Sequence, residues 1–197
     1  MKDITFIIPV FFLVFTCSVI SGELVLKIQA PADTILLRES TTFIVTITNQ
    51  GEDPVTLVDP GDGSVHKMRT PIVGWSVVLA EEYQGKNFDE PLLKYMRRCA
   101  NINPITIEEI FTLKPGETRT IDGWIGKPIF PRPGKYHVAF YYENIPSMPV
   151  FGIPLGRHDP GAIEKIRQSD PYVLKSNKIT VEVCQMKNIR NKSGSLK

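Results

Sequence analysis

Short segments in which apolar and polar residues alternate recur along most of this chain. The two clearest run from Phe43 to Thr48 and from Tyr136 to Tyr142. A period of two is typical of a strand whose sheet has one face buried and the other in water. In the first segment we expect Phe43, Val45 and Ile47 to point into a core.

The same alternation predicts further strands, separated by turns rich in glycine and proline. We expect them at residues 24–28, 34–37, 55–58, 72–81, 105–113, 118–125 and 176–184. No internal repeat or linker divides this series, so residues 23–186 are predicted to form a single domain. The number of strands and their turn chemistry predict an all-β fold, an immunoglobulin-like antiparallel β-sandwich.

Two short helical insertions are expected within this sandwich. Asp89 is followed by Pro91 and then by apolar residues near helical spacing. Asp159 is followed directly by Pro160 and by apolar residues that include Ile166. A capping carboxylate with proline in the first turn marks the start of a helix, so we expect one helix at each position.

The N-terminal residues predict export. Residues 4–20 are nearly all apolar and lead to the small residues Ser21 and Gly22, which favours a cleaved signal peptide at residues 1–22. An uncleaved anchor is the alternative, since such a segment is at the short end of what spans a bilayer. We therefore expect a secreted or periplasmic protein, or a protein anchored in the membrane through this leader. Residues 187–197 are polar and basic, which predicts a disordered tail.

The net charge argues against a nucleic-acid partner, and the cysteine content allows one disulfide bond. The formal net charge is +2 and the basic residues are mostly scattered, so no nucleic-acid partner is expected. After signal cleavage two cysteines remain, Cys99 and Cys184. An oxidising compartment would allow them to form a disulfide, and two free thiols are the open alternative.

Residue types that carry chemistry are sparse. The sequence has no Gly-x-Ser-x-Gly elbow, phosphate-binding loop or His-Glu-x-x-His motif. Glu108 and Glu109 are adjacent on chain expected to be extended, where their side chains would point to opposite faces. Asp59, Asp62 and His66 lack the alternating oxygens of a calcium loop and are too few for a zinc site. We therefore expect no enzymatic activity, no cofactor and no metal.

Two turns carry a resemblance to known domains. They are Leu113-Lys114-Pro115-Gly116-Glu117 and the turn from Arg132 to Val138, and Trp124 lies between them. They resemble turns of immunoglobulin-like β-sandwich domains in exported bacterial proteins, and the pairing is similar to the bacterial intracellular proteinase inhibitor family. The resemblance covers residues 41–143 and implies the sandwich fold, with Tyr136 as a corner residue that hydrogen-bonds a neighbouring connection. The leader and the insertions at 82–104 and 144–176 depart from the inhibitor family.

The connection at residues 144–176 is longer than a hairpin needs. Its first half is apolar and interrupted by prolines, which hold the chain near extended geometry and lower the entropy lost when it docks on a partner. We predict that a partner protein contacts five side chains of this half, Met148, Val150, Phe151, Ile153 and Leu155. In the alternative, the segment folds back and covers the sheet. The expected function is a non-catalytic extracytoplasmic binding or assembly module, and the alternative is a protease inhibitor that presents the 144–176 loop.

Overall fold

Strands make up most of the regular structure in this protein. The computed structural model describes residues 24–39, 41–83, 101–148 and 150–185, and the elements below lie in these ranges. They include a single α-helix, so the predicted all-β class is confirmed. No helix in these ranges, which exclude the predicted leader, is long and apolar enough to cross a membrane.

One sheet has three antiparallel strands. β3 (Ile44–Asn49) lies in the middle, with β1 (Leu24–Gln29) on one side and β8 (Thr118–Ile121) on the other. The chain turns after β3 and before β8 at the same end of this ladder, and beyond these two turns β4 (Val55–Val58) pairs antiparallel with β7 (Ile110–Leu113). The chain of β3 and β4 therefore pairs with the chain of β7 and β8 on both sides of these turns.

A second sheet is built around β9 (Gly134–Asn144). Along one edge of β9 lies β5 (Ile72–Leu79). The other edge pairs first with β12 (Ile179–Cys184) and then with β11 (Tyr172–Lys175), both antiparallel. β2 (Thr34–Leu36) joins the outer edge of β12 in the parallel direction.

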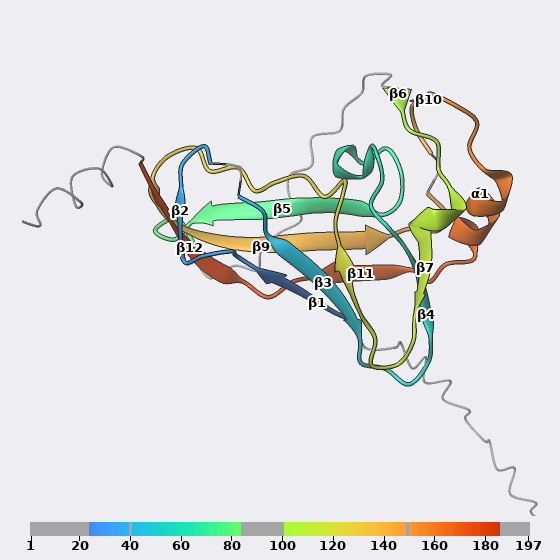
Figure 1. The fold of residues 1–197 in the computed structure, drawn as a ribbon, viewed down its shortest axis with the longest axis horizontal. Coiled ribbons are helices and arrows are strands. Elements are labelled where there is room, and N and C mark those ends of the chain that lie inside the picture. Colours follow the sequence, from blue (N-terminus) through green and yellow to red (C-terminus); the bar gives the residue numbers. More distant parts are fainter. Residues whose placement is uncertain (1–23, 40, 84–100, 149, 186–197) are drawn as a thin grey trace, which may run out of the picture.

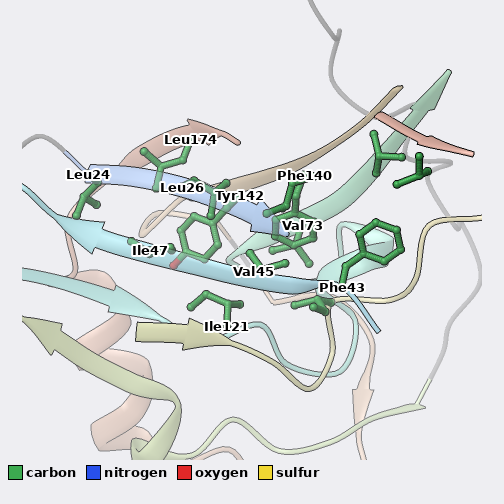
Figure 2. Packing of buried hydrophobic residues seen from close by; sticks show 14 of the residues in the cluster. Leu24, Leu26, Phe43, Val45, Ile47, Val73, Ile121, Phe140, Tyr142 and Leu174 are labelled. Carbon is green, nitrogen blue, oxygen red and sulfur yellow. The ribbon is translucent and has the colours of Figure 1, made fainter. Parts of the chain in front are cut away.

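Side chains from both sheets share one hydrophobic core, shown in Figure 2. The alternation in the sequence predicted its contribution from the first sheet correctly, because Phe43, Val45 and Ile47 are all buried. The second sheet contributes fully buried side chains, among them Val73, Val138, Phe140, Tyr142 and Val181. Because both sheets pack on one core, the strand ends from which the loops start are fixed relative to one another. The immunoglobulin-like strand order remains a prediction.

The smaller elements gather at one end of the molecule, where β6, β10 and α1 lie together in Figure 1, away from β2 at the other end. β6 (Asn101–Ile102) pairs in parallel with β10 (Ile153–Pro154). Two turns of 3-10 helix, η1 (Ser64–His66) and η2 (Ile107–Glu109), precede β5 and β7. α1 (Pro160–Arg167) packs Ala162 and Ile166 into a small second core with Val58 and Ile105.

The structure tests one of the two helical insertions and corrects two strand predictions. The helix after Asp159 is confirmed, and the Asp159 carboxylate accepts a hydrogen bond of 2.8 Å from the Gly161 amide. The helix expected after Asp89 lies outside the described residues. The prediction of a continuous strand over 105–113 was wrong, because η2 precedes β7. Segment 144–176 also contains β11, which pairs with β9 and was not predicted.

Two side chains fix the edges of the sheets. The Tyr136 hydroxyl donates a hydrogen bond of 2.8 Å to the carbonyl of Arg132, which confirms its predicted role as a corner residue. The Asn177 amide bonds both backbone groups of Ile28 in β1, accepting from the N–H at 2.7 Å and donating to the carbonyl at 3.2 Å. Asn177 thus meets β1 as the backbone of a neighbouring strand would.

Candidate functional site

Three of the five predicted contact side chains are exposed. Phe151, Ile153 and Leu155 have 51%, 55% and 66% of their surface accessible, and we refer to these three as the apolar ridge. Ile153 lies in β10, and the other two lie directly beside this short strand. Large apolar side chains exposed this close together are unusual on a protein surface that has no partner.

The other two predicted side chains are partly buried. Val150 packs against the small core around Val58 and Ile105. Met148 is also partly covered, and its amide closes a turn by donating to the Ile145 carbonyl at 2.9 Å. The segment therefore divides between the two alternatives of the sequence analysis. Its start packs against the protein, and its second part lies exposed.

The backbone under the apolar ridge is tied to two other segments. The Phe151 amide donates to the Met68 carbonyl at 2.7 Å, and the Leu155 amide donates to the Ile102 carbonyl at 2.9 Å. Between these two bonds lies the parallel pairing of β10 with β6. The ridge is consequently held in one conformation before any partner arrives, which reduces the entropy that docking would cost.

His158 and Asp159 fasten the segment that follows the ridge. The amide of Ile105 donates to Nδ1 of His158 at 3.1 Å, so this nitrogen is the acceptor and carries no proton. The amide of Asp159 donates to the Ile105 carbonyl at 3.0 Å. Both backbone groups of Ile105 are thereby satisfied, and α1 begins directly beyond them.

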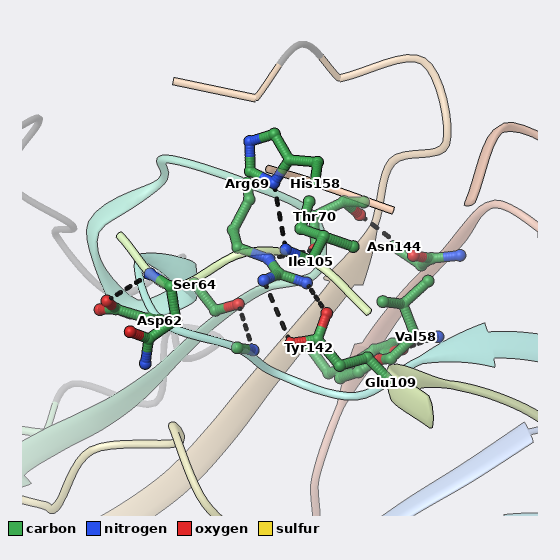
Figure 3. Close-up of polar contacts among 12 residues, drawn as sticks. Val58, Asp62, Ser64, Arg69, Thr70, Ile105, Glu109, Tyr142, Asn144 and His158 are labelled. Carbon is green, nitrogen blue, oxygen red and sulfur yellow. Dashed lines mark hydrogen bonds and ion pairs between the residues drawn. The ribbon is translucent and has the colours of Figure 1, made fainter. Parts of the chain in front are cut away.

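Figure 3 shows a buried arginine, Arg69, in the loop between β4 and β5. The Arg69 side chain has no exposed surface, and its guanidinium bonds both carboxylate oxygens of Glu109, with Nη2 to Oε2 at 2.5 Å and Nη1 to Oε1 at 3.3 Å. Its Nε lies 3.4 Å from the Thr70 carbonyl. This bidentate pair joins the loop that follows β4 to η2, and it also satisfies a charge that would be costly to bury alone.

Asn144, at the end of β9, is the centre of a second buried polar cluster. Its carbonyl oxygen accepts from the Thr70 hydroxyl at 3.0 Å, and its amide nitrogen donates to the Ser169 hydroxyl at 2.9 Å and the Asp170 carbonyl at 2.6 Å. The Thr70 hydroxyl in turn accepts from the Ile145 amide at 2.7 Å. The cluster fixes both ends of the 144–176 connection to the loop that contains Arg69.

The carboxylates considered as metal ligands have other partners. Asp59 forms an ion pair with Arg119, although burial raises the pKa of the Asp59 carboxyl above its usual value. Asp62 accepts a hydrogen bond of 3.0 Å from the Asn103 amide. His66 is exposed on η1. No group of three or more His, Cys, Asp or Glu side chains within the described ranges is arranged to hold a metal ion.

The predicted disulfide remains open. Cys184 ends β12, is partly buried and is free among the described residues. Cys99 lies outside those residues. The pairing of Cys99 with Cys184 therefore stays a prediction.

Neither Arg69 nor Asn144, which fix the base of the ridge, was predicted from the sequence. A signal for Asn144 exists, because it follows the last apolar residue of the strongest alternating segment. The sequence contains no such signal for Arg69, because Arg69 lies in an irregular loop and its partner Glu109 is 40 positions away. No family model, curated protein or solved structure matches this chain.

Proposed function

We propose that this protein is a non-catalytic, extracytoplasmic binding module that docks on a partner protein through the apolar ridge. The observation that supports this most is the exposure of Phe151, Ile153 and Leu155 on a backbone held by hydrogen bonds to Met68 and Ile102. Covering a half-exposed side chain of this size contributes on the order of 1 kcal/mol. Three such side chains on a rigid segment form a small docking surface. The extracytoplasmic location rests on the apolar leader in the sequence.

The buried polar clusters support binding in a different way. Arg69 joins the loop under the ridge to η2, and Asn144 joins the same loop to the end of β9. The ridge is therefore tied to the sheets. Interfaces gain affinity when the contact residues are ordered before binding. A loop that only covered the core would not need this support below exposed side chains.

Photo-crosslinking from the ridge tests the proposal. A photoreactive phenylalanine analogue at position 151, expressed in the native host, should form a crosslink to one protein that the same analogue at position 173 does not form. Position 173 is a suitable control because Val173 is 61% exposed on β11, away from the ridge segment. The crosslinked protein is then purified and its affinity for the wild-type chain is measured.

Charged substitutions decide whether the ridge is the contact. Phe151→Asp and Ile153→Asp should each weaken binding of that partner about tenfold or more, whereas Val173→Asp should leave it unchanged. Equal binding by all three variants would contradict the proposal. If the crosslinked protein is a protease that the chain inhibits in a progress-curve assay, the alternative function as a protease inhibitor replaces it.

A further inference from the structure

Figure 1 shows β2 at the end of the molecule away from β10, and residues of β2 line a groove. Residues 35–39 and 41–43 line one side and residues 127–130 the other, around a volume of about 390 Å³, and we refer to it as the end groove. Its walls are mainly apolar and include Ile35, Leu36, Phe43, Pro128, Ile129 and Phe130. This volume is within the range of about 300–1,000 Å³ typical of small-molecule sites.

The end groove opens onto the hydrophobic core. Phe43 and Ile35 on its floor are buried members of that core. Phe130 packs edge-on against Tyr136, with ring centroids 5.2 Å apart, and this contact holds the second wall in place. A smaller cavity of about 200 Å³ shares Phe43 and Pro128 with the groove and reaches Trp75. The interior therefore suits a hydrocarbon chain more than a polar ligand.

Charged side chains lie at the rim of this apolar interior. Arg38 and Lys127 line it, together with the carboxylate of Glu39. Arg38 makes no ion pair with any residue in the described ranges. The guanidinium is thus available to an anion from solvent, and a carboxylate is the group that its planar fork binds best.

The backbone at Arg38 is also unusual. Its φ of 69° lies in the left-handed region, and the Glu39 amide donates to the Leu36 carbonyl at 3.1 Å, which closes a turn. Glycine or asparagine normally takes this position of such a turn, because other side chains are strained there. Strained residues gather at ligand sites, so an arginine held here at the rim is a second, independent indication of a site.

We propose that the end groove binds a single-chain amphiphile with an anionic head, such as a fatty-acid carboxylate. Its chain lies over Phe43 and Phe130, whose rings pack together with centroids 6.4 Å apart, and its head is bound by Arg38. The guanidinium of Arg38 disfavours a cationic head on the same chain. This binding is separate from docking at the ridge, and either can exist without the other.

Binding of dodecanoate to the purified full chain, below the critical micelle concentration, tests the inference. Methyl NMR resonances of Ile35 and Ile129 should shift and saturate at one ligand per chain, while those of Ile153 on the ridge should not move. Dodecyltrimethylammonium, which has the same chain with a cationic head, should bind about tenfold more weakly or worse. Absence of saturable binding, or equal affinity for the two heads, would overturn the proposal.

Three variants separate the groove from other surfaces. Arg38→Gln should weaken dodecanoate binding about tenfold and should strengthen, not weaken, binding of the cationic probe, since it removes a repelling charge. Leu36→Trp should fill the groove and abolish both, while Leu155→Trp, the matched control on the ridge, should abolish neither. Ile129→Glu tests the rim without risk to folding, since Ile129 is 80% exposed, and it should also weaken dodecanoate binding. Unchanged affinity in Leu36→Trp or Ile129→Glu would contradict the site. Binding to phosphatidylglycerol vesicles without binding to dodecanoate would assign the surface to a membrane instead.

Discussion

The guanidinium of Arg69 and the carboxylate of Glu109 form an ion pair that solvent reaches from one side alone. The arginine side chain has 0% of its surface exposed and the glutamate side chain 22%, although Nη2 and Oε2 are only 2.5 Å apart. Removing either partner therefore has unequal consequences. A lone Glu109 can still be hydrated, whereas a lone Arg69 stays buried with its charge uncompensated.

We predict that Glu109→Ala lowers the free energy of unfolding by about 3 kcal/mol or more, because it leaves this buried charge without a partner. Arg69→Met, which removes the charge and keeps much of the volume, should cost clearly less. Urea denaturation of both variants measures the difference. If Arg69→Met is instead less stable than Glu109→Ala, the unpaired charge of Arg69 is not the larger cost, and the predicted difference between the two partners is wrong.

Gly61 gives a second prediction for the same cluster. A Cβ atom at position 61 would lie 2.5 Å from Nη1 of Arg69, and the buried, paired guanidinium has no room to withdraw. Gly61→Ala should therefore cost about 1–3 kcal/mol of stability.

The penalty at Gly61 should shrink in an Arg69→Met background, since the shorter, uncharged side chain can move aside. A double-mutant cycle by urea denaturation measures this coupling. Gly116→Ala is the matched control: its φ of 76° strains any other residue, but no atom lies within 4 Å of the added methyl. Its cost should be independent of Arg69, and equal coupling at both glycines would disprove the clash.

Tyr142 predicts a dependence of stability on pH. Its buried hydroxyl donates to the Val58 carbonyl at 2.7 Å, and burial raises the pKa of this hydroxyl above its usual value. A tyrosine in the unfolded chain loses its proton near pH ~10. Above that pH the unfolded state therefore binds fewer protons than the native state, and the free energy of unfolding falls as pH rises.

Tyr142→Phe should remove this contribution. At neutral pH the variant should be less stable by about 1–2 kcal/mol, because the backbone groups of Val58 lose a buried partner. Above pH ~10 its stability should fall less steeply than that of the wild type, by about 1.4 kcal/mol per pH unit. Urea denaturation between pH 7 and about 11 provides both values, and parallel curves would show that Tyr142 does not carry the effect.

The imidazole of His158 predicts a local effect. His158→Ala leaves the Ile105 amide without its acceptor at 3.1 Å, so hydrogen exchange at Ile105 should speed up. Global stability should fall by only about 1 kcal/mol. His66→Ala, at an exposed histidine on η1, should change neither quantity. An unchanged exchange rate at Ile105 in His158→Ala would show that another group holds this amide.

Alternation of apolar and polar residues was sufficient to predict most strands of the two sheets that share the core. Phe43, Val45 and Ile47 repeat every second residue because one face of β3 packs on the core, and the same reasoning located most of β9. β11 was missed because it is four residues long and buries only Leu174, so its pattern is too short to recognise. It forms because β9 continues to Asn144 and offers an edge, which is a property of the tertiary structure.

From the sequence, the candidate site could be recognised only by its unusual amino-acid composition. Prolines and apolar residues distinguished 145–155 from an ordinary hairpin connection. The same residues are compatible with a loop that covers the sheet and with a loop that is exposed. Pairing with Ile102 and Met68 separates Phe151 from Val150, and those partners lie far away in the sequence. The burial of Arg69 has the same cause, since it depends on Glu109 in a turn that alternation predicted to be extended.

The amide of Asn177 also bears on how this protein behaves at high concentration. Sheet edges with free backbone groups recruit strands from other molecules, which is a common start of aggregation. By bonding both backbone groups of Ile28, Asn177 closes that position on β1 to a neighbouring molecule. A single side chain therefore helps to keep this edge of the three-stranded sheet from seeding intermolecular β-structure.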